Sequence, residues 1–565
     1  PDGTHITIRM MGDEKVKWAE TIDGYSLLLN SDGFYEYAVK DTNGDMQKSG
    51  IRAKNIAERS HEDQTFIASL EKGLRFSPEQ IGLMLQIWEI RNTEAGKAFP
   101  TTGNRKLICI LIGFTDKAFV RTQTEFNNLF NQVGYTTGGA TGSVKDYYLE
   151  NSYNQFNLTV DVAGPYTASN TMAYYGANDV NGNDVRPREL AAEAVNLANP
   201  DVNYANYDND NDGWVDAVYI IYAGYGEEAG GGANTIWAHA WNLISPLYLD
   251  GKYIQRYSCS PELRSNSGST ITAIGVICHE FGHVLGAPDY YDTNYSTGGQ
   301  FTGTGQWDMM ANGSWNNSGV TPAHHNGYTK VYYYNWASAN TISTGQTITL
   351  QNAAQNTNSF YRYNTTTNNE FFFLENREKH LFDAYIPGSG MIIYHVHSNI
   401  ATGFNSNTIN ATHPQMMYPV CQNATSDPTS NPSSYGSINL ASCAWTGTGK
   451  TAFTDTSTPS SKSWAGANTN KPITNISRNA TAKTVTFTFM GGSSGNPAIS
   501  VTPGSLTQTL QTNQVATQTL TISNTGTAAL NWQIAVNTTS AALAPILPEN
   551  HGAESGVSAN FEGVD

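Results

Sequence analysis

The stretch from residue 279 to residue 289 reads His-Glu-Phe-Gly-His-Val-Leu-Gly-Ala-Pro-Asp, and it constrains this chain more than any other segment. Side chains four positions apart share one face of a helix, so His279 and His283 can direct both imidazoles at one metal, with Glu280 beside them as a base. A chance match to His-Glu-x-x-His in a chain with this composition is expected about 0.02 times. The alternative, a buried histidine pair flanking a salt-bridged glutamate, is disfavoured. The spacing therefore predicts a hydrolytic zinc site.

The residues after this helix indicate how the metal site is completed. Gly286 can adopt a positive φ and end the helix, which turns the chain back and brings Asp289 toward the same metal. With His279, His283 and Asp289 as ligands, the fourth coordination position is left for water.

The choice of Asp289 rests on the absence of other acids. Between His283 and Glu370 the chain contains no glutamate, and Asp289, Asp292 and Asp308 are the only carboxylates nearby. Asp289 stands ten residues after the first histidine, where the extended motif has its last ligand. We expect Asp292 to be a turn residue or a carboxylate that holds a histidine ring through its other nitrogen.

A turn-rich stretch follows about thirty residues downstream, Gly-Gln-Trp-Asp-Met-Met-Ala-Asn-Gly at 305–313. It resembles the Met-turn of metzincins, in which a methionine packs beneath the zinc ligands. Met310 is the better candidate because Ala-Asn-Gly supplies a tight turn directly after it. A core methionine is the alternative.

Together these motifs resemble the immune inhibitor A family of secreted zinc metallopeptidases, a metzincin-like group. Further similarity lies in Asn-Glu-Phe-Phe-Phe-Leu-Glu-Asn-Arg at 369–377, in the segment 383–395 and in the N-terminal Gly12-Asp13-Glu14. The resemblance covers roughly residues 1–490. It implies an α+β multidomain protein with a metzincin-like α/β catalytic domain, an N-terminal prosegment and C-terminal all-β, sandwich-type domains.

The expected organisation follows from this resemblance and from shifts in composition. The prosegment is expected at 1–100, the catalytic domain at 101–340 and a β-rich domain at 341–490. A Gly-Gly-Ser-Ser-Gly linker then leads into an incomplete Ig-like β module at 491–540, and a tail without regular structure at 541–565.

The first hundred residues contain clear local signals. Asp23-Gly24, Asp32-Gly33 and Asn43-Gly44 predict hairpin turns in a small antiparallel sheet. Ser77-Pro78 predicts a helix start, with the helix running to Arg91. As a prosegment, this region would inhibit the enzyme intramolecularly. It has no cysteine, which excludes latency through a thiolate on the zinc, and leaves a carboxylate such as Asp13 as a candidate.

A second metal motif is Asp-Asn-Asp-Asn-Asp-Gly-Trp-Val-Asp at 208–216. Carboxylates at alternate positions, with glycine sixth, match the start of a calcium loop, so the sequence favours a structural Ca²⁺ held by Asp208, Asp210, Asp212 and Asp216. The twelfth position is Tyr219, which lacks the usual bidentate acid. A solvated acidic turn is the alternative.

Composition limits the cellular setting. A formal net charge of −17 argues against nucleic acid as a partner, and no apolar run approaches the roughly 18 residues of a membrane span. Low charge content and the family resemblance lead us to expect a secreted protein, on the cell surface or free, whose signal peptide has been removed or is not part of the given sequence. Among five cysteines, Cys109 and Cys278 are expected to be buried thiols, whereas Cys421 and Cys443 are candidates for a disulfide.

Four remaining signals concern the surroundings of the site. The segment 237–241 is expected as a strand at the cleft rim that could pair with an extended peptide, and His239 within it is not needed as a ligand. His395 and His397 share one side of a strand, where ordinary packing is favoured over a metal. Glu375, Arg377 and Asp383 are expected to form a buried ionic network that joins the β-rich domain to the catalytic domain.

The function expected from these observations is secreted zinc-dependent endopeptidase activity, made as a zymogen. Water on the zinc attacks the peptide carbonyl, and Glu280 accepts its proton and passes it to the leaving amine. Substrates are proteins or peptides, including glycoproteins. The alternative is a glycoprotein-directed peptidase, or an adhesin-like protein whose β modules recognise glycans.

Overall fold

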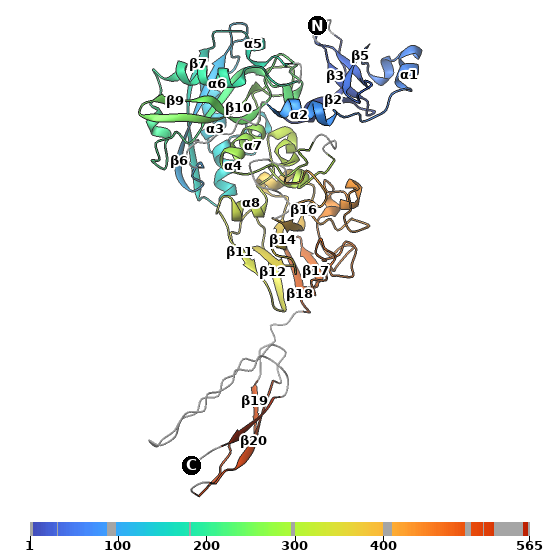
Figure 1. The fold of residues 1–565 in the computed structure, drawn as a ribbon. Helices are drawn as coiled ribbons and strands as arrows, with labels where there is room; N and C mark the ends of the chain where they lie inside the picture. The colour runs from blue at the N-terminus through green and yellow to red at the C-terminus, as the bar shows by residue number, and fades with distance from the viewer. Residues whose placement is uncertain are drawn as a thin grey trace.

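The computed structural model describes residues 4–30, 32–86, 98–179, 182–294, 300–398, 409–491, 499–511, 514–524 and 557–562. Within these ranges the chain combines helices with several separate sheets, so the expected α+β, multidomain class is confirmed. Figure 1 shows the N-terminal sheet beside the part predicted to be catalytic (residues 101–340, called the catalytic part below), and the β-rich part on another side of it.

The N-terminal region is a five-stranded antiparallel meander followed by two helices. Its strands are β1 (Ile8–Gly12), β2 (Lys17–Thr21), β3 (Ser26–Leu29), β4 (Tyr35–Lys40) and β5 (Met46–Arg52). The dipeptides predicted as turns at residues 23–24, 32–33 and 43–44 lie in the connections of this meander. The helices are α1 (His61–Ile67) and α2 (Pro78–Gln86). The predicted continuation of α2 to Arg91 lies outside the described residues, because residues 87–97 are not among them.

The catalytic part is built on a second five-stranded sheet in the order β7-β6-β8-β10-β9. Its strands are β6 (Gly103–Gly113), β7 (Phe156–Thr167), β8 (Val218–Tyr225), β9 (His239–Leu249) and β10 (Lys252–Leu263). All neighbours run parallel except β9, which pairs antiparallel with β10 and ends the sheet. The segment predicted at the cleft rim therefore leads into an edge strand.

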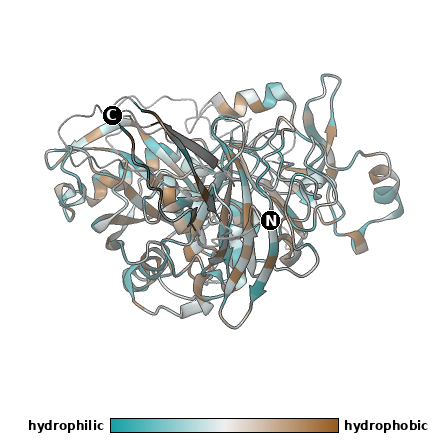
Figure 2. Ribbon diagram, turned by 90° about the horizontal axis from the view of Figure 1, so that it is seen from below, coloured by the Kyte–Doolittle hydropathy of each residue, from teal (hydrophilic) through white to brown (hydrophobic). Residues whose placement is uncertain are grey.

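Alternation along β6 divides the apolar side chains between two cores. Leu107, Cys109 and Leu111 pack on one face, whereas Ile108 and Ile110 pack on the other, because successive strand residues point to opposite faces. Figure 2 shows apolar and polar residues interleaved along the elements. One face is covered by α3 (Gln123–Asn131), α4 (Val144–Asn151) and α7 (Ile274–Val284), and the other by α5 (Met172–Gly176) and α6 (Pro187–Ala198).

The β-rich part contains two sheets that share the core of the first face. One has the order β11-β13-β14-β15-β16 and the other β12-β18-β17. Phe372 of the first sheet and Phe487 of the second belong to the same buried cluster as Phe281 of α7, so catalytic and β-rich parts are packed as one body. The elements are α8 (Gly327–Tyr332), β11 (Ala339–Thr341), β12 (Gln346–Leu350), β13 (Phe360–Asn364), β14 (Glu370–Arg377), β15 (Gly390–His397), β16 (Met417–Pro419), β17 (Ile473–Asn479) and β18 (Thr484–Phe489).

The C-terminal region has a small sheet of β19 (Ile499–Thr502), β20 (Thr517–Asn524) and β21 (Val557–Glu562). Most of the predicted linker, and much of the predicted Ig-like module, lie outside the described residues. The tail differs from its expectation over residues 557–562, which pair antiparallel with β20. An exposed strand edge presents unpaired backbone groups, and this segment supplies partners for them.

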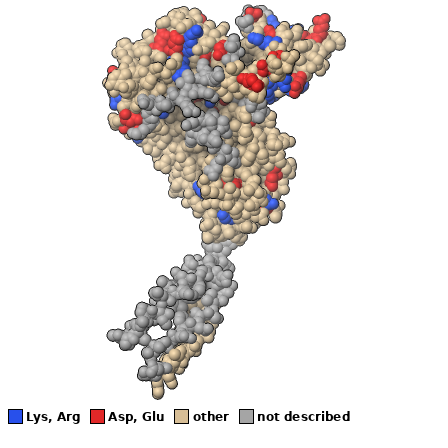
Figure 3. Space-filling view, viewed as in Figure 1, with Lys and Arg blue, Asp and Glu red and all other residues tan. Residues whose placement is uncertain are grey.

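Two expectations from composition can be compared with the structure. All five cysteines are buried free thiols, so Cys109 and Cys278 are as predicted, whereas a disulfide between Cys421 and Cys443 is not formed. Among the described residues, no helix combines the length and apolarity needed to cross a bilayer. On the face shown in Figure 3, charged side chains gather on the N-terminal and catalytic parts, and the β-rich part is largely uncharged.

Candidate functional site

Helix α7 holds His279, Glu280 and His283 against the floor of a cleft. Its N-terminal half approaches the 3-10 segment η6 (Asn312–Gly319) closely, since a Cβ added at Gly275 would lie 2.0 Å from the carbonyl oxygen of Ser314. Only glycine allows this contact. The helix ends as predicted, because Gly286 has φ of 101° and the Gly286 amide donates to the carbonyl of His283 at 2.9 Å.

Both histidines are held by their Nδ1 atoms. Nδ1 of His279 donates to the carbonyl oxygen of Met309 at 3.0 Å, and Nδ1 of His283 donates to that of Ala287 at 2.9 Å. A carbonyl can only accept, so each Nδ1 carries the hydrogen and, in the neutral ring, each Nε2 retains a lone pair. Backbone contacts thus set the tautomer that a metal requires.

The two Nε2 atoms converge on one carboxylate. Asp289 Oδ1 lies 3.3 Å from Nε2 of His279 and 3.4 Å from Nε2 of His283. The ligand atoms of these three residues all lie within 4.8 Å of one another. The structure therefore brings together the three residues that the sequence predicts as zinc ligands, and their two imidazoles and one carboxylate are a donor set that suits zinc.

Electrostatics couple the three side chains. Burial alone lowers the pKa of His279 and His283, but the carboxylate of Asp289 outweighs it and raises the pKa of both. Burial raises the pKa of Asp289, yet the two histidines hold it well below its ordinary value. The cluster thus favours positive charge at its centre, which a divalent cation supplies more strongly than a proton.

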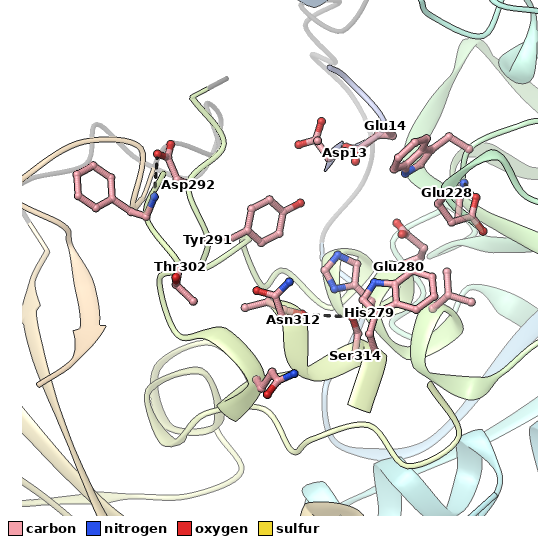
Figure 4. Close-up of a pocket in the computed structure, with 18 of the residues that line it drawn as sticks. Asp13, Glu14, Glu228, His279, Glu280, Tyr291, Asp292, Thr302, Asn312 and Ser314 are labelled. Carbon is pink, nitrogen blue, oxygen red and sulfur yellow. Dashed lines mark hydrogen bonds between the residues drawn. The ribbon is translucent and has the colours of Figure 1, made fainter. Parts of the chain in front are cut away.

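The cleft above α7 is a cavity of about 400 Å³ that includes His279 and Glu280 among its lining residues. Glu280 faces into it from one wall, with Glu228 close by (Figure 4). Burial raises the pKa of Glu280 well above its ordinary value; His279 opposes this shift, and Glu14, Asp289 and Glu228 add to it. A carboxylate with a raised pKa beside a metal centre is suited to accept and return protons.

The stretch at 305–313 lies directly beneath α7. A Cβ added at Gly282 would come within 2.5 Å of the sulfur of Met310, so this methionine packs against the helix between the two histidines. Met310 is fully buried, and its backbone carbonyl accepts from Tyr290 N at 2.8 Å. Asp308 is buried too, and accepts from the side chains of Thr304 and Asn326 at 2.9 and 2.7 Å. Hydrogen bonds therefore hold this turn at the backbone of Met310 and at the side chain of Asp308.

Asp292 has the first of its two expected roles. Its carboxylate accepts from the backbone amides of Asn294, Gln300 and Phe301, which makes it a turn residue. Burial raises its pKa to about 6, against these hydrogen bonds. The suggestion that it holds a histidine ring is wrong, because backbone carbonyls already occupy the Nδ1 atoms of His279 and His283.

The N-terminal region contributes to the same cleft. Gly12 at the end of β1, and Asp13 and Glu14 in the turn that follows, line the cavity with His279, and Figure 4 shows Asp13 and Glu14 across it from Glu280. Asp13 Oδ1 accepts from Lys15 N and Val16 N at 2.8 and 3.1 Å. Its other oxygen, Oδ2, is buried without a hydrogen-bond partner.

Sequence reasoning missed Glu228 in this cleft, and it placed Trp237 in a strand at the rim without assigning its ring to the site. Glu228 follows the end of β8 after Gly226-Glu227. Paired acids at the carboxyl end of a buried parallel strand are a usable signal, since this end of a sheet is where ligands bind. Trp237 precedes β9 in the segment predicted at the rim, but no local pattern marks its ring as facing the cleft.

The acidic loop at 208–216 brings three of its four predicted ligands together. Ligand atoms of Asp208, Asp210 and Asp212 lie within 4.8 Å of one another. Asp216 is directed elsewhere, and its Oδ2 accepts from the backbone amide and side chain of Asn209 at 2.8 and 2.7 Å. Nζ of Lys252 donates to Asp208 Oδ2 at 2.5 Å.

The other histidines singled out in the sequence lie outside the cluster on α7. His239 is buried, with ring nitrogens next to Trp237 O at 2.7 Å and the hydroxyl of Tyr257 at 2.8 Å. His395 contacts Glu370 at 2.7 Å and stacks on the ring of Trp464. Packing is therefore their role in this structure.

The predicted ionic network is present. Arg377 donates to both oxygens of Asp383, at 2.8 and 2.6 Å, and to Glu375 at 3.2 Å. It also donates to the carbonyl of Trp307 at 2.7 Å, while Asp383 accepts from His324 N at 2.9 Å. These contacts fasten β14 to the loops around the methionine turn.

Comparison with known proteins agrees with this geometry. Residues 104–342 match the family described as "Immune inhibitor A peptidase M6, catalytic domain". The chain is 36% identical over 240 residues to "Pre-pro-metalloprotease PrtV" of Vibrio cholerae serotype O1 (strain M66-2), covering 37% of this chain and 25% of that protein. It is 31% identical over 245 residues to "Immune inhibitor A" of Bacillus thuringiensis subsp. alesti, covering 36% and 34%.

The chain thus spans about a quarter to a third of the length of these curated relatives. The matched residues include α7, Asp289 and Met310, and they coincide closely with the catalytic part of the fold. Residues 104–342 are therefore a metallopeptidase catalytic domain of the immune inhibitor A (M6) family.

Proposed function

We propose that the chain is a zinc-dependent endopeptidase in which His279, His283 and Asp289 hold the metal and Glu280 is the general base and acid. The observation that carries this proposal is the convergence of two Nε2 atoms and one carboxylate oxygen within 4.8 Å at the floor of a cleft. A zinc ion held there supplies a Lewis acid that acidifies water and polarises the peptide carbonyl.

The protein's own groups do the remaining work. Glu280 takes a proton from the attacking water and delivers it to the nitrogen of the leaving amine, so no covalent intermediate with the protein forms. Met310 is the apolar floor that fixes α7, which is the basis for proposing a metzincin-like arrangement. The edge strand β9, which follows Trp237 at the cleft wall, offers its backbone to an extended peptide.

Removal of one ligand tests the metal assignment. We expect His283→Ala to lose stoichiometric zinc and all measurable hydrolysis, because one imidazole and one carboxylate form too weak a site. His380→Ala, at a partly exposed residue after β14, is the matched control and keeps both when the proteins are assayed after limited proteolysis near residue 100. Metal analysis of dialysed protein measures the difference. Stoichiometric zinc in His283→Ala would show that the ligand set is wrong.

We further propose that the chain is a zymogen whose N-terminal region inhibits it through Asp13. Asp13 Oδ2 is a buried carboxylate oxygen without a partner, on a turn that lines the same cavity as His279. Such an oxygen is costly unless it meets a cation, and here it competes with substrate at the metal centre. The printed name of the Vibrio relative, a pre-pro-metalloprotease, supports a precursor form.

Asp13→Asn tests this inhibition with little change of shape. Its amide oxygen can keep the hydrogen bonds to Lys15 N and Val16 N, while the second oxygen becomes an NH₂ group that cannot bind a metal. We expect the uncut Asp13→Asn chain to hydrolyse casein at least about tenfold faster than the uncut parent. Asp32→Asn, at an exposed turn of the same sheet, serves as control. Equal rates for all three uncut proteins would rule out Asp13 as the inhibitory group.

The setting proposed for this activity is extracellular, with proteins or peptides as substrates. The low content of charged residues, 14%, supports it. Glycoproteins remain within the proposed substrate range. The alternative of an adhesin-like protein with glycan-binding β modules is not favoured, because the matches are to a peptidase catalytic domain and a metalloprotease.

A structural calcium ion at Asp208, Asp210 and Asp212 is a separate proposal. The loop is tied to β6 through Asn209, which accepts from Lys106 N at 2.8 Å, so a bound ion would stabilise the sheet. We expect added Ca²⁺ to raise the melting temperature of the parent chain and to leave that of Asp210→Asn unchanged, as measured by scanning calorimetry. The same rise in both proteins would exclude this loop as the binding site.

A further inference from the structure

Lys17 of β2 is a buried cation held by acids of the catalytic part. Its Nζ donates to Asp184 Oδ1 at 2.9 Å and makes a short contact with Glu227 Oε2. The side chains are only 5% exposed for Lys17 and 7% for each acid. The ring of Trp237 lies over the ammonium group, 5.5 Å from nitrogen to centroid. Two carboxylates and an aromatic face thus enclose one ammonium group.

The two acids are positioned without help from the N-terminal region. Asp184 Oδ2 accepts from the backbone amide of Trp237 at 2.9 Å, and Glu227 Oε1 accepts from the side chain of Asn178 at 2.7 Å. The amide of Glu227 donates to Ile236 O at 3.0 Å. All these partners belong to the catalytic part, so the acid pair is already built when Lys17 leaves. A buried carboxylate pair without a cation is strongly unfavourable.

The acid pair adjoins the hydrolytic centre. Trp237, whose ring faces Lys17, lines the same cavity as His279 and Glu280, and Glu228, the neighbour of Glu227, lies close to Glu280 in it (Figure 4). Asp13 lines this cavity only four positions before Lys17 in the chain. One peptide segment therefore reaches both the candidate metal centre and the acid pair.

We infer that Asp184, Glu227 and Trp237 form a binding site for a lysine side chain of the peptide substrate, occupied by Lys17 until the N-terminal region is removed. This inference rests on the proposed peptidase function and names part of its specificity. Both carboxylates accept hydrogen bonds from one nitrogen. This arrangement suits the compact ammonium group of lysine, with its three donors, better than the planar guanidinium group of arginine.

The cation site can be tested in the full chain without any hydrolysis. Lys17→Ala leaves both carboxylates buried and vacates the space of the side chain, so its melting temperature should fall by several degrees. n-Butylammonium chloride should restore part of this loss, whereas n-butanol and sodium chloride should not. Lys54→Ala, which removes an ion pair with Asp63 at a 41% exposed lysine, is the control and should not respond to n-butylammonium. Equal responses of both variants to n-butylammonium would overturn the site.

Substrate preference is tested on the chain after limited proteolysis, with matched peptides that carry lysine, arginine or norleucine at each position around the cleaved bond. We expect lysine to be preferred over arginine and norleucine at one position. Combined Asp184→Asn and Glu227→Gln should lower kcat/KM for that lysine peptide by roughly 10- to 100-fold, as for lost hydrogen bonds to a charged group, and change the norleucine peptide little. Glu189→Gln, a half-exposed acid on α6, should alter neither.

The outcomes separate this inference from the proposed function. Casein hydrolysis without any lysine preference, or equal losses on both peptides in the double variant, would overturn the lysine site and leave the peptidase intact. Absence of hydrolysis in every form would count against the proposed function, and the response to n-butylammonium would still decide whether the acid pair binds an ammonium group.

Discussion

Replacement of Glu280 by glutamine is expected to lower the rate of peptide hydrolysis by about 10²- to 10⁴-fold while zinc stays bound. The glutamine keeps the size and place of the side chain on α7, but it cannot accept a proton from water. The metal should be unaffected because the proposed ligand atoms come from His279, His283 and Asp289. Initial rates on denatured casein, taken after limited proteolysis near residue 100, together with metal analysis of the same samples, measure both quantities.

The control for this substitution is Glu189→Gln, which makes the same chemical change on a half-exposed side chain outside the cleft. It should retain full activity. If Glu280→Gln keeps more than a tenth of the parent rate, Glu280 is not the general base. If its zinc is lost as well, the residue has a role in holding the metal site that the geometry does not explain.

Arg377→Met is expected to destabilise the fold by about 3–5 kcal/mol, the cost of leaving a buried charge without its partner. Arg377 is 1% exposed, and its guanidinium is enclosed by Asp383, Glu375 and the carbonyl of Trp307. The methionine fills the volume but leaves both carboxylates buried. Urea unfolding followed by tryptophan fluorescence gives the free energy. Arg362→Met, at a more exposed arginine of β13, should cost about 1 kcal/mol or less.

The ion pair between Arg377 and Asp383 also predicts how the stability of the fold depends on pH. Burial would raise the pKa of Asp383, but Arg377 and the other partners outweigh it and hold this pKa at about 2, below the ordinary value of 3.8. The folded state therefore binds fewer protons than the unfolded state between these values, so the contribution of Asp383 to stability is complete above about pH 5. It is lost as the pH falls through 3.8 toward 2.

Asp383→Asn removes this titration. Its free energy of unfolding should be lower than that of the parent at pH 7, and should fall less between pH 5 and pH 2. A parallel decline of both proteins over this range would contradict the assigned pKa shift. An Arg377→Met variant as stable as Arg362→Met would contradict the role of the network as a fastening between the β-rich and catalytic parts.

The cluster of candidate metal ligands was predictable because its information is local. The spacing of His279, Glu280 and His283 defines one helix face, and Gly286 marks the turn that returns Asp289 to it, so pattern and structure agree. The hairpin turns of the N-terminal sheet were predictable for the same reason, since each depends on two adjacent residues. Met310 could be chosen from the sequence because a tight turn follows it directly.

Features that depend on distant parts of the chain were not predictable. Lys17 meets Asp184 and Glu227 across 167 and 210 positions, and no local pattern joins them. The role of Asp292 was misjudged in one respect, because the backbone carbonyls of Met309 and Ala287 hold the histidines instead. The strand at 557–562 also escaped prediction, because its partner β20 lies in a separate segment.

Hydrolysis of denatured casein by the purified chain, before and after limited proteolysis near residue 100, tests the central claim most directly. The account predicts little activity in the uncut chain, activity after cleavage, its loss with a zinc chelator and its return with added zinc. Cleaved protein that contains stoichiometric zinc and hydrolyses no casein, or activity that survives complete removal of the metal, would contradict a latent zinc endopeptidase.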